Sequence, residues 1–175
     1  MGKQAQKGAG AIYRYHRGDL RQIVPDITIS NAICFAPDAP VAYFTDTPTG
    51  QIMRQPLDPA NGWPKGTPEV FLDLKPRGLN PDGAVTDAAG NIWVAFWGDH
   101  TVRAFDPAGH EIHKIDLPAK QPTCPAFGGA DLSDLYVTSA TQGLDLTDRN
   151  THPENGMTFC FAGVGTGRAE PQVIL

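Results

Sequence analysis

The sequence lacks the features that would assign it quickly to several large classes of protein. No apolar run reaches the roughly 18 residues that a membrane-spanning helix needs, and the first seven residues contain no apolar core of a secretory signal. No cluster of Lys and Arg is dense enough to follow a phosphate backbone, and the formal net charge is −5. We therefore expect neither a membrane nor a nucleic acid as a partner.

Cysteine is scarce, with three residues that lie far apart: Cys34, Cys124 and Cys160. They form no Cys-x-x-Cys metal motif, and an odd number of widely spaced cysteines does not make a disulfide framework. We expect small, mostly buried thiols in a reducing compartment, which predicts a cytoplasmic protein.

Several catalytic and binding motifs are also missing or incomplete. The sequence has no Gly-x-Ser-x-Gly elbow and no His-Glu-x-x-His, which excludes serine- and zinc-protease-type mechanisms. His110 and His113 lie three apart, so on a strand they point to opposite faces and do not chelate together. The run 145–150 departs from a calcium loop and predicts an acidic loop. The glycines of 163–167 precede no helix and predict a connection to a last strand over 172–175.

Glycine and proline are abundant instead, with 19 and 16 residues that separate short runs of Val, Ile, Tyr, Phe and Trp. Such punctuation of β-branched and aromatic segments is typical of an all-β protein. No segment carries a sustained helical period with caps, so we expect no helix beyond a short one near 142–151.

The chain repeats itself at a spacing of about fifty residues. Tyr43 aligns with Trp93 and Ile52 with Val102, and a looser third copy begins at Thr123. Repeats of 40–50 residues with four short strands each are the signature of β-propeller blades, which bury their faces by stacking on neighbours. The sequence predicts about three and a half four-stranded blades, whereas known propellers close with four to eight. The predicted units are 1–9 (an extension), 10–25 (two outer strands of a blade), 26–76, 77–120 and 121–175 (one blade each).

Asn80-Pro81-Asp82-Gly83 stands where one repeat ends and the next begins. Alone, this string is a common turn, since proline sets φ and glycine tolerates positive φ. The repeat, however, places Asp82 at the head of an innermost strand, one blade after Asn31. In a propeller such positions converge on the axis, so an amide and a carboxylate from neighbouring blades would face the same channel. Trp93 is expected in the blade core and Trp97 in the channel lining.

Several strings occur together in the order and spacing of a known family: Ile29-Ser30-Asn31-Ala32, Tyr43–Gly50, Asn80-Pro81-Asp82-Gly83, Gly90–Ala95, and Phe127-Gly128-Gly129 followed by Leu135–Thr138. From about Gly10 to its end, the chain resembles the gluconolactonase, regucalcin and senescence-marker-protein family. The resemblance implies a six-bladed propeller that binds one divalent metal in its channel and hydrolyses sugar lactones and related esters. It implies that Asn31 is a metal ligand, and that Asp82 is both a ligand and the general base.

The donors fit that chemistry, because amide and carboxylate oxygens suit Ca²⁺, Mg²⁺, Mn²⁺ or a tolerant Zn²⁺ site. Two departures accompany the resemblance. The family's first ligand, a glutamate, and its substrate-holding arginine and asparagine have no counterpart in residues 1–10, and Ala32 replaces the usual glycine. The expected partners are thus a small lactone and either further N-terminal blades or a second copy.

Three functions stay open from the sequence. The first is a metal-dependent lactone hydrolase. The second is a calcium-binding propeller portion or scaffold without turnover, and the third is a strictosidine-synthase-like propeller. The joint match of Asn31 and Asp82 favours the first.

Overall fold

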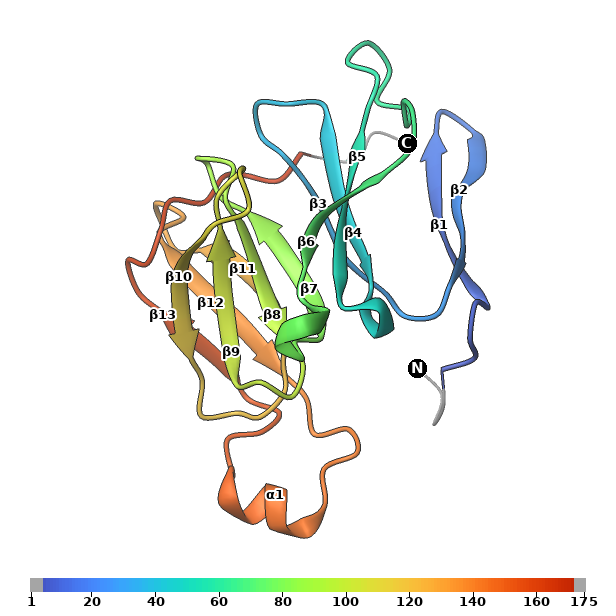
Figure 1. Cartoon of the computed structure of the whole chain (residues 1–175). Helices are drawn as coiled ribbons and strands as arrows, with labels where there is room; N and C mark the ends of the chain where they lie inside the picture. Colours follow the sequence, from blue (N-terminus) through green and yellow to red (C-terminus); the bar gives the residue numbers. More distant parts are fainter. Residues whose placement is uncertain (1–4, 172–175) are drawn as a thin grey trace.

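The computed structural model of the chain describes residues 5–171, which form four antiparallel sheets side by side (Figure 1). The first sheet is β1 (Gly10–His16) and β2 (Asp19–Ile27), and the second is β3 (Ser30–Phe35), β4 (Val41–Asp46), β5 (Gln51–Pro56) and β6 (Glu69–Asp73). The third is β7 (Pro81–Thr86), β8 (Ile92–Phe96), β9 (Thr101–Phe105) and β10 (Glu111–Asp116). The fourth is β11 (Pro122–Gly128), β12 (Asp134–Ser139) and β13 (Thr158–Phe161).

The helical segments are short. Two single 3-10 turns, η1 (Thr47–Thr49) and η2 (Lys75–Arg77), follow β4 and β6, and one α-helix, α1 (Leu146–Thr151), follows β12. The all-β prediction is confirmed, and so is a short helix near 142–151. Part of the predicted acidic loop is therefore helical, because the Asp145 carboxylate accepts a hydrogen bond from the Asp148 amide at 2.7 Å and caps its first turn. The last strand predicted at 172–175 lies outside the described residues.

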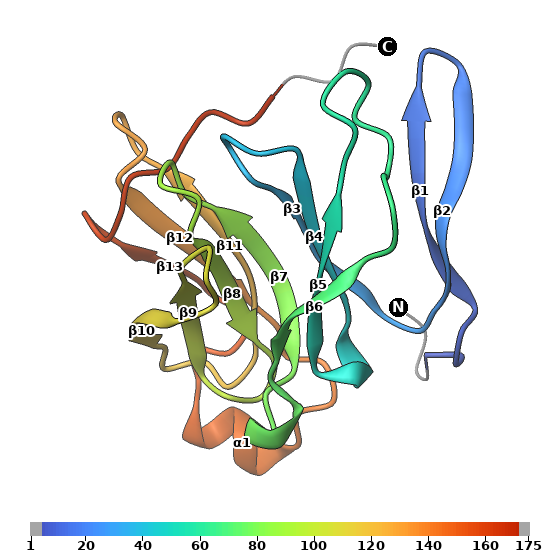
Figure 2. The same ribbon diagram turned by 45° about the horizontal axis from the view of Figure 1, so that its top comes forward.

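The first strands of the second, third and fourth sheets lie next to one another and hold the sheets together. β7 contacts β3 on one side and β11 on the other, and the sheets fan out from these three strands (Figure 2). The Thr86 hydroxyl donates to the Phe35 carbonyl at 2.6 Å, which joins the ends of β7 and β3. We call β3, β7 and β11 the inner strands.

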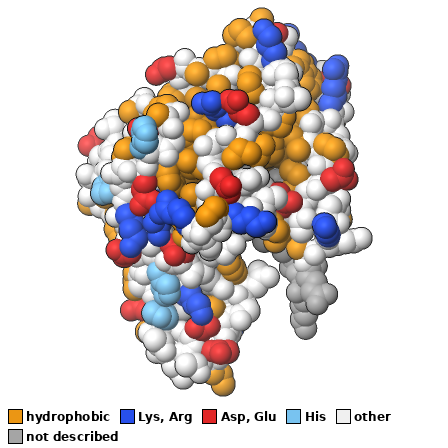
Figure 3. All heavy atoms as spheres, viewed as in Figure 1, with side chains coloured by type: hydrophobic (Ala, Val, Ile, Leu, Met, Phe, Trp, Pro, Cys, Tyr) orange, Lys and Arg blue, Asp and Glu red, His pale blue; other side chains and the backbone are white. Residues whose placement is uncertain are grey.

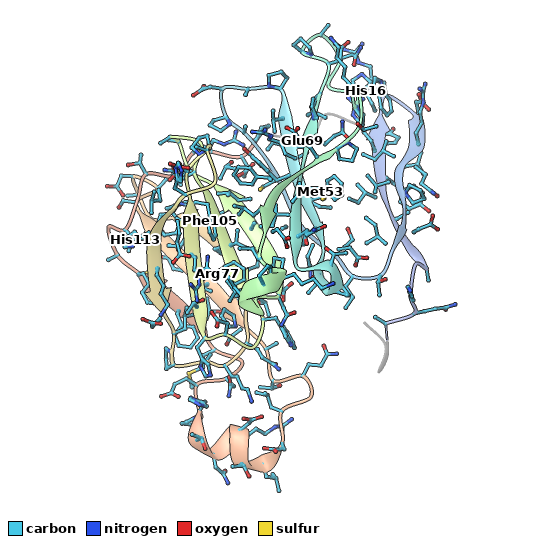
Figure 4. All side chains as sticks on the ribbon, in the orientation of Figure 1. His16, Met53, Glu69, Arg77, Phe105 and His113 are labelled. Atoms are coloured by element: carbon cyan, nitrogen blue, oxygen red, sulfur yellow. The ribbon has the colours of Figure 1, made fainter. Side chains whose placement is uncertain are left out.

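Three hydrophobic clusters fill the spaces between neighbouring sheets. Ile52 and Phe96 belong to the cluster between the second and third sheets, and Trp93 and Val137 belong to the one between the third and fourth. Met53 reaches from β5 toward the β1–β2 hairpin in the third cluster (Figure 4). Each large side chain buried there contributes about 1.5–3 kcal/mol, so the stacking of the sheets supplies the core that no single sheet has.

An ion-pair chain adds a polar link between the second and third sheets. Arg77, on η2, contacts the Glu111 carboxylate of β10 at 2.6 Å (Figure 4). Glu111 also faces Arg103, which pairs with Asp99 at 2.9 Å. Because Arg103 is mostly buried, this network is less screened by water than an isolated surface pair.

The repeated Asp-x-x-Gly turn between strands has a structural role. Asp87, between β7 and β8, is buried, and its carboxylate accepts from the amides of Ala89 and Asn91, from Asn91 Nδ2 and from Trp93 Nε1 at 2.8–3.0 Å. The single carboxylate therefore fixes the turn and the buried Trp93 together. The predicted core position of Trp93 is confirmed.

The segment after β13 runs back over one end of the inner strands. The Thr166 carbonyl accepts from the Ala88 amide at 2.8 Å, and Arg168 Nη2 donates to the Phe35 carbonyl at 2.9 Å. A Cβ at Gly167 would lie 2.2 Å from Phe127 Cβ, so only glycine allows this close approach. This segment covers the end of β3 and β7 that is opposite to Asn31 and Asp82.

The cysteine prediction was partly wrong. Cys34 is buried, but Cys124 and Cys160 are exposed. Cys160 lies on β13, the outermost strand of the fourth sheet within the described residues, and Cys124 lies on the inner strand β11, at the end that neighbours Gly83 and Asp82. All three thiols are free. Within residues 5–171 no helix has the length and apolar character to cross a membrane.

Candidate metal and lactone site

The candidate site is built from equivalent positions on the inner strands. Ser30, Pro81 and Pro122 each pair with the last residue of the second strand of their sheet, namely Asp46, Phe96 and Ser139. The next position along each inner strand is Asn31, Asp82 and Thr123, respectively. Since β7 contacts both neighbours, these side chains belong to the same level of adjacent strands. The structure thus brings Asn31 and Asp82 to one end of the inner strands.

Register shifts mark all three strands at this level. The pairing slips between Asn31 and Cys34, between Pro81 and Ala84, and between Pro122 and Cys124. Such bulges bend a strand and redirect side chains that a regular ladder would point alternately to the two faces of the sheet. The repeated irregularity therefore belongs to the site and sets the direction of its side chains.

Ala32 and Gly83 directly follow the candidate ligands Asn31 and Asp82. Their backbone conformation and packing make this part of the inner strands sensitive to side-chain size. Ala32 has φ = 52°, a left-handed conformation that glycine adopts more readily. A Cβ at Gly83 would lie 2.6 Å from the Thr123 carbonyl oxygen and 2.8 Å from Cys124 Sγ. Glycine at 83 lets β7 and β11 approach closely, whereas alanine at 32 is held in a conformation that costs about 1 kcal/mol.

A threonine hydroxyl links the two candidate ligands. Asn31 Nδ2 donates to Thr47 Oγ1 at 3.0 Å, and Thr47 Oγ1 donates to the Pro81 carbonyl at 2.8 Å. Pro81 immediately precedes Asp82, so this chain of hydrogen bonds joins the Asn31 side chain to the peptide that carries Asp82.

The Asp82 carboxylate has no hydrogen-bond donor among the described residues, and it is half-buried. Burial raises its pKa from 3.8 to about 6, because water is partly excluded and no neighbouring cation compensates. The same region raises the pKa of Cys124, first through burial of the thiol and then through the charge of Asp82. The site thus contains a carboxylate whose charge nothing on the described chain neutralises.

This donor set fits a divalent cation. The Asp82 oxygens and Asn31 Oδ1 accept no hydrogen bond from the described residues, and both are hard oxygen donors. A bound cation would compensate the desolvated Asp82 charge. Within the part of the chain that the structure describes, no three His, Cys, Asp or Glu side chains converge as a metal-binding group.

The other residues singled out in the sequence lie away from this level or have structural roles. His110 faces Asp106 at 3.1 Å, and the His113 ring lies tilted against that of Trp93, with 5.5 Å between the ring centroids. Both histidines are exposed. Trp97 is half-buried and its amide donates to the Asn80 carbonyl at 2.9 Å, next to the site, so its place in the channel lining stays a prediction.

Sequence reasoning missed Thr47 and Thr123. Thr47 lies on η1, outside the repeats that identified the inner strands, and although it belongs to the Tyr43–Gly50 string it was given no role there. Thr123 shares the register of Asp82 and its hydroxyl lies 2.6 Å from that of Thr138, but it was read only as the start of a repeat. Aligning the third copy position by position would have found it.

An apolar hollow of about 350 Å³ lies between the β1–β2 hairpin and the second sheet, and hydrophobic side chains are exposed over this part of the surface (Figure 3). Tyr13 and Tyr15 of β1 and Ile33 and Phe35 of β3 line it, and each is about half exposed. Within the described residues β1 pairs only with β2. Both a free strand edge and an apolar surface of this kind are features that β-proteins normally cover.

The protein is all-β, and its sheets stack around the inner strands. The Asn31 amide and the Asp82 carboxylate, at one end of these strands, form a candidate metal site between the sheets. Residues 1–141 match the family described as the SMP-30/Gluconolactonase/LRE-like region, and the chain belongs to this family.

Similar proteins carry lactonase and regucalcin names. A Rhizobium meliloti protein named "Putative sugar lactone lactonase" is 45% identical over 98% of this chain and 58% of its own length. The 6-deoxy-6-sulfogluconolactonase of Pseudomonas putida is 37% identical over 94% of the chain and 57% of its own length. The crystal structure of a calcium-binding protein, regucalcin, from Agrobacterium tumefaciens superposes with a TM-score of 0.94 at 43% identity, over 98% of this chain and 58% of that one. The chain thus spans somewhat more than half the length of these relatives.

Proposed function

We propose that this chain contributes Asn31 and Asp82 to a divalent-metal site of a hydrolase that opens sugar-acid lactones. The observation that carries the proposal is the pairing itself: an amide and a desolvated carboxylate occupy equivalent positions on neighbouring inner strands, and a single hydroxyl ties them together. The lactonase names of relatives that are 45% and 37% identical support the substrate class. The calcium-binding regucalcin supports a divalent cation, with Ca²⁺, Zn²⁺, Mn²⁺ and Mg²⁺ as the candidates.

Asn31 and Asp82 would hold the cation through Oδ1 and a carboxylate oxygen. When bound, the cation would polarise the lactone carbonyl and stabilise the oxyanion that develops on it. Asp82 takes the proton of the water that attacks the carbonyl carbon. In the metal-free protein burial raises its pKa to about 6, so the group is still ionised at neutral pH and its lone pairs are free to take the proton.

The proposal extends to the architecture. The four sheets, of two, four, four and three strands, correspond to about three and a half blades of a six-bladed propeller. Further blades from the N-terminal side, or a second copy of the chain, would cover the free edge of β1 and the apolar hollow beside it. A cytoplasmic location is part of the proposal and rests on the three free thiols.

The second candidate is a calcium-binding propeller portion without turnover. It is favoured by one observation: the chain spans 58% of the length of its relatives and offers two candidate ligands, whereas Ca²⁺ takes six to eight oxygens.

A gluconolactone hydrolysis assay, in which a pH-stat measures the acid released, tests the two candidates. The protein is stripped with EDTA and assayed alone and with each of the four cations, next to Asp82→Asn and Asn31→Ala. We expect turnover that depends on the cation and is lost in Asp82→Asn. Turnover without metal, or turnover that survives Asp82→Asn, would contradict the mechanism. Bound Ca²⁺ without hydrolysis under any cation would favour the second candidate.

A further inference from the structure

The hydroxyl of Thr47 has a single proton, and its two hydrogen-bond partners, the Pro81 carbonyl and the Asn31 side chain, determine to which of them it donates. The Pro81 carbonyl oxygen, 2.8 Å away, can only accept a hydrogen bond. Thr47 must therefore donate to Pro81, and its oxygen has only lone pairs left for Asn31, 3.0 Å away. The group of Asn31 that faces Thr47 must then be the amide nitrogen. The orientation of this amide follows from the proton count alone.

We propose that Thr47 is a positioning residue that locks the Asn31 side chain with Oδ1 turned away from Thr47 and available to a divalent cation. The inference rests on the proposed function, since it deepens the role of Asn31 in that site. Without the lock, an amide rotates between two orientations, one of which presents an NH₂ group that no cation binds. Thr47 acts through Asn31 and is not itself a ligand.

Thr47 can hold this position because the turn that carries it is fixed on several sides. The Asp46 carboxylate accepts from the amides of Thr28 and Ile29 at 3.0 and 2.7 Å. The Thr47 amide donates to the Ile29 carbonyl at 3.0 Å, and Pro48 restrains the start of η1. These contacts anchor η1 to the segment that leads into β3, so the hydroxyl and the amide it orients move together.

The same hydroxyl also restrains the second candidate ligand. By holding the Pro81 carbonyl it fixes the peptide before Asp82, at the point where β7 leaves its regular ladder. Positioning contacts behind metal ligands typically change metal affinity 10–100-fold when they are removed. The structure places one such contact between two sheets, where it spans both halves of the candidate site.

Two substitutions distinguish the effect of the Thr47 hydroxyl from that of the shape of the side chain. Thr47→Val keeps the branched volume and removes the hydroxyl, whereas Thr47→Ser keeps the hydroxyl. Thr49→Val is the matched control, because Thr49 Oγ1 donates to the Asp46 carbonyl at 2.8 Å in the same turn but does not contact Asn31. The rate at which the Asn31 Nδ2 protons exchange with solvent, measured by NMR in the absence of metal, reports directly on the hydrogen bond from Asn31 to Thr47. We expect exchange about fivefold faster in Thr47→Val and unchanged in the other two variants.

Calcium binding, measured by titration calorimetry with Ca²⁺ alone, tests the consequence for the site. We expect Thr47→Val to bind Ca²⁺ 10–100-fold more weakly, and Thr47→Ser to stay within about threefold of the parent protein. In an Asn31→Asp background both terminal atoms are oxygens, so rotation no longer matters. Thr47→Val should then cost clearly less than in the parent protein, with only the part due to the lost Pro81 contact remaining.

An equal loss in the parent and the Asn31→Asp backgrounds would overturn the orientation mechanism, as would unchanged exchange of the Asn31 amide in Thr47→Val. A parent protein that binds no Ca²⁺ but shows the expected exchange pattern would instead overturn the proposed metal site and leave the positioning of Asn31 supported. The two readouts thus distinguish failure of this inference from failure of the proposed function.

Discussion

Replacing Asp82 by asparagine should stabilise the metal-free protein at neutral pH and leave it unchanged in acid. Burial raises the pKa of Asp82 to about 6 in the folded state, from 3.8 in the unfolded chain. Between these values the folded state binds more protons than the unfolded one. The stabilisation from this group is therefore fully present below about pH 4 and is lost as the pH rises through about 6. An asparagine has no charge to desolvate, so the Asp82→Asn variant does not lose this stability as the pH rises.

The size of the effect follows from the pKa shift. A shift of about two units corresponds to about 3 kcal/mol, at roughly 1.4 kcal/mol per unit. Asp82 is only half-buried, so solvent screening reduces the expected difference to about 1–2 kcal/mol. We expect the free energy of unfolding of Asp82→Asn to match that of the parent protein at about pH 3.5 or below and to exceed it by this amount at pH 7.5.

Urea unfolding at several pH values with EDTA present measures the difference. Asp38→Asn, at an exposed aspartate, controls for the loss of one negative charge. A difference between Asp82→Asn and the parent that stays constant from about pH 3.5 to 7.5 would refute the reasoning. Saturating Ca²⁺ should reverse the order at pH 7.5, because only the parent protein gains stability from binding.

Three further predictions concern the scaffold. Gly83→Ala places a Cβ 2.6 Å from the Thr123 carbonyl oxygen and should lower the free energy of unfolding by about 2–3 kcal/mol, measured in urea. Asp87→Ala leaves several buried donors without an acceptor and should cost about 3 kcal/mol or more, with a change in the fluorescence of the tryptophan it contacts; full retention of stability would contradict its structural role. Burial raises the pKa of Cys34 to about 12, so a thiol reagent at pH 8 should label the two exposed cysteines and reach Cys34 only after unfolding; early labelling of Cys34 would contradict its burial.

The sequence by itself determined the local structure and the family. Short runs of β-branched and aromatic residues between glycine and proline predict strands, and the structure has them at the repeated positions. The fifty-residue repeat was enough to put Asn31 and Asp82 at equivalent places, because strand register is fixed by which face is buried. A short helix near 142–151 also followed from local signals.

Tertiary structure alone decided how the candidate site is held. Thr47 precedes Pro81 by 34 positions, and only the packing of β3 against β7 brings its hydroxyl between the Asn31 amide and the peptide of Asp82. The raised pKa of Asp82 likewise depends on which sheets exclude water from it, and exposure of Cys124 and Cys160 depends on how closely neighbouring strands pack on each thiol. Residue patterns encode strands and turns because those depend on neighbours along the chain, whereas desolvation and the direction of a hydrogen bond depend on neighbours in space.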